Sequence, residues 1–138
     1  MNNTAYVLFL LPLFALMTPF IIWPIEQLFP YPYIVEEVAK GIFIFFVLSL
    51  PHRKTQLLYA ILIGLLFSLS ENVLYIFNII NVGTVSFLLE RLFLTIALHI
   101  GTMLVMFIVA LRNRRLVPLG VQVAGIAHYL FNSWVLSL

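Results

Sequence analysis

Tyr33-Ile34-Val35-Glu36-Glu37-Val38-Ala39-Lys40-Gly41 is the stretch that decides how this 138-residue chain is interpreted. Two adjacent carboxylates and an ammonium open one of the most hydrophobic segments of the sequence. On a helix, Lys40 lies four residues after Glu36 and three after Glu37, so its ammonium can reach either acid. Prolines just before the stretch suit a helix start, where acids are favoured by the helix dipole. The stretch alone leaves a structural and a functional interpretation equally open.

The composition indicates an integral membrane protein of helical type. Hydrophobic residues make up 64% of the chain and charged residues 9%, whereas a soluble domain is roughly half apolar and a quarter charged. Long apolar runs separated by short polar gaps are typical of membrane helices. The chain has no cysteine and no aspartate, which excludes disulfides, thiolate nucleophiles and cysteine-bound metals. The net charge of +2 is small, and we expect no nucleic-acid partner.

We predict an all-α, polytopic membrane protein with about five transmembrane helices in one antiparallel bundle. Short connections between the apolar segments favour a single domain over residues 1–138. Pro12 and Pro19 are expected to kink the first helix. The sequence does not indicate an oligomeric state. The predicted helices are Thr4–Trp23, Tyr33–Leu50, Thr55–Ile80, Thr84–Leu111 and Val117–Leu138.

The basic residues predict the orientation of the chain in the membrane. Five of the seven Lys and Arg residues lie in two loops, 51–54 and 112–115. Basic loops remain on the cytoplasmic side, so the N-terminus is expected in the cytoplasm and the C-terminus outside. The end of the second helix that carries Glu36 and Glu37 then faces outward.

Ionisable groups also occur inside the predicted membrane segments. Glu71, His99 and His128 each lie well inside a helix, where an isolated charge costs a few kcal/mol, about 2.5–3.5 on insertion scales. A single histidine there is as often a hydrogen bond between helices as a functional group. Together, the three acids Glu36, Glu37 and Glu71 and the two histidines lie at similar depth, and this conjunction predicts a shared pocket. The polar positions that follow helical spacing are Gly64, Ser68, Glu71, Tyr75 and Asn78, then Arg91, Thr95, His99 and Thr102, then Gly125, His128 and Asn132.

The opposite halves of the same helices are almost wholly apolar. The segments 42–50, 57–67 and 103–111 hold few polar residues. A channel or an alternating-access carrier needs polar groups along its whole path. The pattern favours a cavity that is open toward the outer side and closed below.

The available residues limit the chemistry that this cavity could perform. No aspartyl dyad, H-E-x-x-H motif or G-x-S-x-G motif is present. Carboxylates and histidines remain, and such an acid could take a proton from water while a histidine shares the task or stabilises an oxyanion. Asn132, one turn after His128, is a candidate second oxyanion donor. Glutamate and histidine can also bind zinc, so a metal site stays an alternative to the metal-free and cofactor-free site that we expect.

Four motifs follow one another along the chain: Glu36-Glu37-Val-Ala-Lys40, Phe67-Ser-Leu-Ser-Glu71-Asn72-Val-Leu-Tyr75, Arg91 followed by His99, and His128-Tyr-Leu-Phe-Asn132. Together they resemble the PrsW family of intramembrane glutamic proteases, which belongs to a wider group with CAAX prenyl proteases and bacteriocin-processing or immunity proteins. The resemblance covers residues 33 to 132, with one motif per helix. The prenyl-protease branch has E-E-x-x-x-R and a histidine in place of Glu71, so prenylated substrates are not supported.

The resemblance implies roles for these residues. Glu36 or Glu37 would activate the hydrolytic water, Glu71 and His99 would complete the water site, and His128 with Asn132 would support the tetrahedral intermediate. Lys40 and Arg91 would hold the acids in place. The substrates would be membrane-associated proteins or peptides, cleaved at the plasma membrane of a prokaryote.

Three alternatives remain from the sequence. The first is a non-enzymatic membrane protein of the binding or immunity type. The second is a metal-dependent membrane protease. The third is a small proton-coupled transporter, which the apolar lower half of the bundle disfavours.

Overall fold

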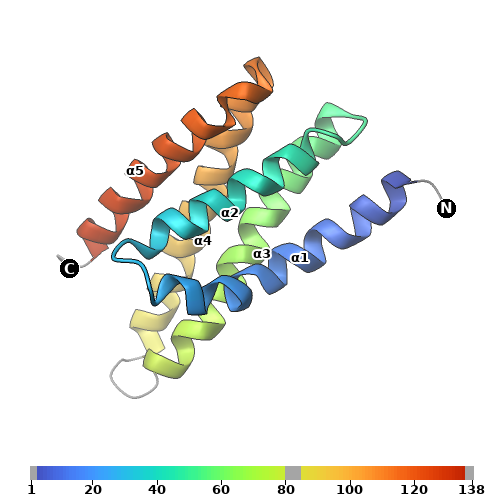
Figure 1. The fold of residues 1–138 in the computed structure, drawn as a ribbon. Coiled ribbons are helices and arrows are strands. Elements are labelled where there is room, and N and C mark those ends of the chain that lie inside the picture. The colour runs from blue at the N-terminus through green and yellow to red at the C-terminus, as the bar shows by residue number, and fades with distance from the viewer. Residues whose placement is uncertain (1–2, 80–84, 136–138) are drawn as a thin grey trace.

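The computed structural model describes residues 3–79 and 85–135, and this part of the chain is helical (Figure 1). Three of the five α-helices are long and apolar enough to cross a membrane, namely α1, α3 and α4. The chain is therefore an integral membrane protein built from helices. The elements are α1 (Asn3–Glu26), α2 (Pro32–Val47), α3 (Arg53–Ile79), α4 (Val85–Arg112), the 3-10 helix η1 (Arg114–Leu116) and α5 (Val117–Val135).

The helix boundaries differ from the predicted ones by a few residues. The first helix was predicted to end at Trp23, but α1 continues through Pro24 to Glu26. The second was predicted to reach Leu50, but α2 ends at Val47. The predicted boundaries at 80, 84 and 138 lie outside the described residues, as does the side chain of Asn78.

Both ends of α2 have a local cause. Pro32 occupies the first turn, where its fixed backbone angle suits a helix and its missing N–H removes no bond. At the other end, the amide of Gln56 donates to the carbonyl oxygens of Leu48 at 3.3 Å and Leu50 at 2.7 Å. These bonds satisfy acceptors that the end of a helix leaves unpaired. The start of α3 is thereby tied to the end of α2.

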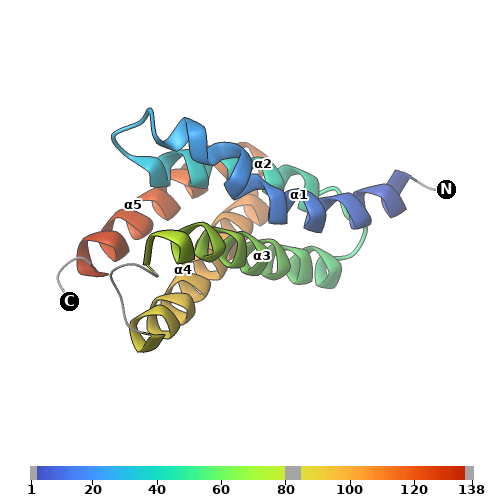
Figure 2. The same ribbon diagram turned by 90° about the horizontal axis from the view of Figure 1, so that it is seen from below.

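The helix α2 is the centre of the bundle. It contacts each of the four other α-helices, whereas α3 packs mainly on α1 and α4, and α5 packs on α4 and α2. Figures 1 and 2 show α2 lying between α1 and α5, with α3 and α4 across from it. The predicted helix that carries Glu36, Glu37 and Lys40 therefore forms the middle of the molecule.

The side chains of α2 reverse the usual amphipathic pattern. Glu37 and Lys40 are fully buried, together with Ile44, whereas Val38 and Ile42 on the opposite face are about half exposed. In water, such a helix would expose apolar surface and bury charge, which is unfavourable on both sides. In a lipid environment, the exposed apolar face costs little and the charges are shielded inside. With only 16 residues, α2 is shorter than the roughly 20 residues of a perpendicular span.

A glycine sets the spacing between α3 and α4. A Cβ added to Gly64 would lie 2.8 Å from the carbonyl oxygen of His99 and 2.9 Å from the Cα of Ile100. These are backbone atoms of α4, so a larger residue would force the two helices apart. The close approach at Gly64 brings His99 within reach of the acid on α3.

Candidate active site

Lys40 is the hub of a buried hydrogen-bond network. Its ammonium donates to Glu37 Oε1 at 2.5 Å and to Thr102 Oγ1 at 3.0 Å, and it lies 2.9 Å from His99 Nδ1. The ring of Phe67 covers it, with the centroid 5.3 Å from Nζ. Lys40 could have reached either neighbouring acid by helical spacing, and the structure pairs it with Glu37. All three hydrogens of the ammonium are used within the protein.

The bond to Lys40 determines the tautomer of His99. An ammonium only donates hydrogen bonds, so Nδ1 of His99 accepts from Lys40 and its proton is on Nε2. That Nε2–H donates to a carboxylate oxygen of Glu71 on α3. The imidazole is therefore held from both sides, and its ring also packs against Phe67 at a centroid distance of 5.3 Å. Glu71, His99 and Lys40 form a continuous chain across α3, α4 and α2.

The second histidine extends this chain to α5. The Nδ1 of His128 lies 2.7 Å from Glu37 Oε1, and because a carboxylate accepts, this nitrogen carries the proton. Its Nε2 has no hydrogen-bond partner among the described residues. The rings of His128 and His99 meet edge to face at 5.4 Å. The two histidines of the cluster therefore lie side by side, His99 bonded to Lys40 and Glu71 and His128 bonded to Glu37.

Two carboxylate oxygens in the cluster are buried without a partner. These are Glu36 Oε2 and Glu37 Oε2. The nearest ion-pair partner of Glu36 is His128 Nδ1, at 3.8 Å. With neutral histidines, the three carboxylates of Glu36, Glu37 and Glu71 face two cations, Lys40 and the Arg91 guanidinium beside the cavity, so negative charge is in excess. A buried site of this kind favours the uptake of protons or of a cation.

A cavity of about 330 Å³ opens onto the cluster. Six of the eight predicted site residues line it, from α2, α3, α4 and α5, and the other two, Glu37 and Lys40, lie behind it in the same network. The structure therefore brings all eight residues together. The lining residues named by the sequence analysis are Glu36, Glu71, Arg91, His99, His128 and Asn132.

Arg91 lines the cavity without pairing with an acid. Its guanidinium lies over the ring of Tyr75, at 3.8 Å from the centroid, and its Nε is buried without a partner. In the described part of the chain, Arg91 forms no ion pair with a carboxylate. Its position suits binding of a further group in the cavity better than holding Glu71.

Glu26 is a member of the site that the sequence analysis missed. It lies at the end of α1 and lines a small cavity of about 130 Å³ that also touches Glu36 and Glu71. The first predicted helix ended at Trp23, so Glu26 fell outside the predicted helices. No spacing relates it to the motifs, so only the packing of α1 on α2 and α3 reveals it.

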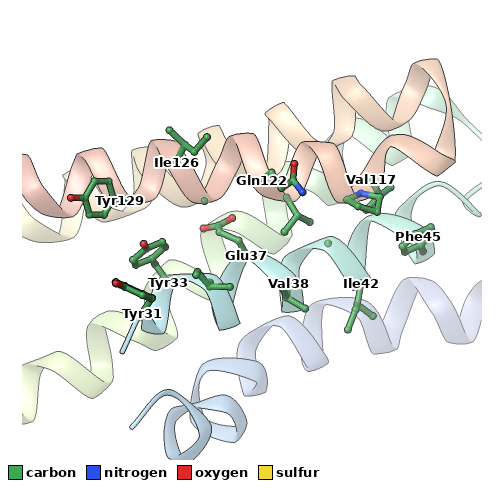
Figure 3. Close-up of a pocket in the computed structure, with 15 residues that line it drawn as sticks. Tyr31, Tyr33, Glu37, Val38, Ile42, Phe45, Val117, Gln122, Ile126 and Tyr129 are labelled. Atoms are coloured by element: carbon green, nitrogen blue, oxygen red, sulfur yellow. The ribbon is translucent and has the colours of Figure 1, made fainter. Parts of the chain in front are cut away.

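A wide apolar groove of about 960 Å³ runs between α2 and α5 and reaches Glu37 (Figure 3). Tyr31, Tyr33 and Tyr129 lie at one end of it, and Val117 and Phe45 lie toward the other. Glu37 points from α2 into the space between the two helices (Figure 3). Tyr33 also lines the 330 Å³ cavity. The groove therefore connects a surface made mostly of apolar and aromatic side chains to the charged cluster.

These features define a class of protein: a helical membrane protein with an ionisable cluster in its interior and a cavity beside it. The particular family follows from comparison. The model of the PrsW family intramembrane metalloprotease matches residues 4–138, and the chain belongs to this family of intramembrane proteases. The PrsW family inferred from the four motifs is thereby confirmed, whereas the description of the family says metalloprotease where we expected the glutamic type. No curated protein and no solved structure matches the chain.

The description of the family as metalloproteases implies a metal ion, and the candidate ligands in the cluster fit such an ion only in part. Single ligand atoms of Glu36, Glu37 and His99 lie within 4.8 Å of one another, and these residue types bind zinc. The unpartnered oxygens of the two acids are free to bind a cation. Both nitrogens of His99, however, are already hydrogen-bonded, one of them to the Lys40 ammonium. A cation bound by all three residues would have to displace Lys40 or Glu71 from His99.

The network predicts that Lys40 contributes strongly to stability. Lys40→Met removes the ammonium that pairs with the buried charge of Glu37 and leaves the Nδ1 of His99 without a donor, which costs about 3–5 kcal/mol. The matched variant Thr102→Val removes one weaker bond from the same ammonium and costs about 1 kcal/mol. Thermal unfolding of the detergent-solubilised protein, followed by circular dichroism, compares the two. Equal unfolding temperatures for the two variants would show that Lys40 does not hold the cluster.

Proposed function

We propose that this protein is an intramembrane endopeptidase that hydrolyses membrane-associated proteins or peptides with water activated by its carboxylate–histidine cluster. Membership of a protease family supports hydrolysis of a peptide bond. The observation that carries the proposal is the 330 Å³ cavity, onto which ionisable side chains from four helices converge. Such groups are expensive to keep in a membrane interior, and they are usually functional there.

In the proposed mechanism, Glu36 is the residue that accepts the proton of the water. It lines the cavity, it makes no hydrogen bond among the described residues, and His128 is 3.8 Å away. Glu37 is engaged by Lys40 and His128, so its role is to orient them. The hydroxide formed by loss of the proton to Glu36 adds to the carbonyl carbon. The C–N bond then breaks, and the proton passes from Glu36 to the leaving amine.

The remaining groups would stabilise the charge that develops on the carbonyl oxygen. Asn132 lines the same cavity one turn after His128, and its amide is a donor. The guanidinium of Arg91, with its unpartnered Nε, is a second source of positive charge. Donors of this kind stabilise a tetrahedral intermediate and typically contribute several kcal/mol, about 3–4 for one donor.

The substrate is proposed to lie in the groove between α2 and α5. An apolar groove beside Glu37 would accept a membrane-embedded segment without exposing its side chains to water. In this arrangement all five helices of the single domain 1–138, with the motif core 33–132, lie in the plasma membrane of a prokaryote. The N-terminus is cytoplasmic and the C-terminus is outside, as the basic loops predict.

The metal-dependent protease is the second candidate function. Glu36, Glu37 and His99 would then hold the ion, which would polarise the scissile carbonyl as a Lewis acid. The family description favours this alternative, and the engaged nitrogens of His99 disfavour it. A non-enzymatic binding protein is the third, and it would not need an unpartnered acid beside the cavity.

Replacement of single acids separates the two protease functions from the binding protein. Glu36→Gln is expected to lower cleavage by at least about 100-fold, because general acid–base catalysis typically contributes 10²–10⁴. Glu36 makes no hydrogen bond among the described residues, so the variant should keep its fold. Glu90→Gln is the matched control, since Glu90 is exposed on α4 and lines no cavity of the site. Purified variants incubated with membrane-protein segments are read by mass spectrometry.

Glu37→Gln and Glu71→Gln extend the same experiment, and both should lose cleavage together with part of the stability. Identical fragments from Glu36→Gln and the unchanged protein would remove the enzyme proposal. That result would favour the binding protein, whose function should tolerate the change.

Narrowing the groove tests where the substrate lies. A Cβ added at Gly125 meets nothing within 4 Å, so Gly125→Leu should fold and project into the groove. Cleavage is expected to fall by about 10- to 100-fold, because a small displacement of the scissile bond is sufficient for such a loss. Gly101→Leu is the control, since its added Cβ also meets open space and Gly101 lines no described cavity. Equal cleavage by both variants would place the substrate elsewhere.

Chelation tests the role of a metal. Because Lys40 occupies one nitrogen of His99, EDTA or 1,10-phenanthroline is expected to leave the cleavage rate unchanged. The metal content of the active protein, measured by mass spectrometry of the elements, should be well below one ion per chain. Loss of activity with chelator and recovery with zinc would establish the metal-dependent function in its place.

A further inference from the structure

A separate, polar cavity of about 440 Å³ lies where the two basic segments of the chain meet. Arg53 and Gln56 at the start of α3 line one side of it. Arg112, Asn113 and Arg114 line the other side, at the end of α4 and the start of η1. Segments almost 60 residues apart in the sequence thus contribute three guanidinium groups to one cavity, and none of the acids of the active site lines it.

The three guanidinium groups are not neutralised. Among the described residues, none of them forms an ion pair, and no carboxylate lines the cavity. Arg53 donates to Gln56 Oε1 at 3.0 Å, and Arg114 donates to the carbonyl oxygen of Leu48 at 2.6 Å. Each of these bonds uses one of the five N–H groups of a guanidinium, so donors remain for a ligand. The cavity therefore combines three positive charges that no carboxylate neutralises with N–H groups that are free to donate to a ligand.

The position of the cavity relates it to the membrane surface. Two of the apolar stretches that can span a membrane are Arg53–Ile76 and Leu89–Arg112. Arg53 begins one of them and Arg112 ends the other, so the cavity lies at the level where such spans reach the headgroups. Leu57 and Leu58, one turn into α3, have exposed side chains that could contact an acyl chain.

We propose that this cavity binds a phosphate group, and that the group belongs to the headgroup of an anionic phospholipid. Guanidinium forks match the oxygen atoms of phosphate, and basic pockets between membrane helices hold such headgroups. The volume exceeds what a single phosphate ion needs and leaves room for the glycerol part. This site is separate from the proposed protease site, and its test does not depend on cleavage.

The test compares two neighbouring arginines by lipid binding. The full chain in neutral detergent, at about 150 mM salt to screen general attraction, is titrated with short-chain phosphatidylglycerol and followed by native mass spectrometry. Arg112→Gln should weaken binding about tenfold, because it removes a charged donor from the cavity. Arg112 makes no hydrogen bond among the described residues, so its replacement should not disturb the fold. Arg115→Gln removes the same charge three residues away, outside the cavity, and should change binding by less than about threefold.

Two further titrations identify the source of the phosphate. Phosphatidylcholine, which carries a phosphate but no net charge, is expected to bind much more weakly than phosphatidylglycerol. Inorganic phosphate at millimolar concentration should not displace the lipid. Displacement by inorganic phosphate would overturn the assignment to a lipid, and equal effects of Arg112→Gln and Arg115→Gln would overturn the site itself.

Discussion

The ammonium of Lys40, fully buried in the middle of the bundle, is the constraint on which the rest of the structure depends. A buried cation is tolerated only when each of its donors has an acceptor and a negative charge is near. Here the acceptors are Glu37 on α2 and His99 and Thr102 on α4. Glu37 is bonded in turn to His128 on α5, and His99 is bonded to Glu71 on α3. The result is one chain of contacts, from Glu71 through His99, Lys40 and Glu37 to His128, that links α3, α4, α2 and α5.

This chain explains how a small membrane protein can keep reactive groups in place. The helices are apolar on the outside, and in lipid such surfaces do not drive association as they do in water. Polar bonds at the centre therefore carry much of the specificity of packing, together with close approaches such as that at Gly64. The same bonds fix the ring orientation of both histidines. They leave Glu36 beside the cavity as an acid without a hydrogen bond among the described residues.

The molecule separates its charges between two ends. The acids of the cluster and Glu26 gather around the ends of α1 and α3 and the start of α2, while the basic segments meet beyond the end of α2. This division arises because successive connections lie at opposite ends of the bundle, and both basic segments, 51–54 and 112–115, are connections at the same end. It gives one end chemistry suited to protons and water, and the other end an affinity for anions. The apolar core between them separates the two environments.

The sequence by itself determined the class of the protein, its family and the residues to consider. Apolar length and the cost of charge in lipid are local properties, so the helices, the inward position of Glu71 and both histidines followed from spacing alone. Tertiary structure decided which groups touch. Helical spacing allowed Lys40 either acid, and only the packing of α4 and α5 against α2 selects Glu37. Glu26 and the arginine-lined cavity depend likewise on contacts between distant segments, because no pattern along a single helix records which neighbour it will meet.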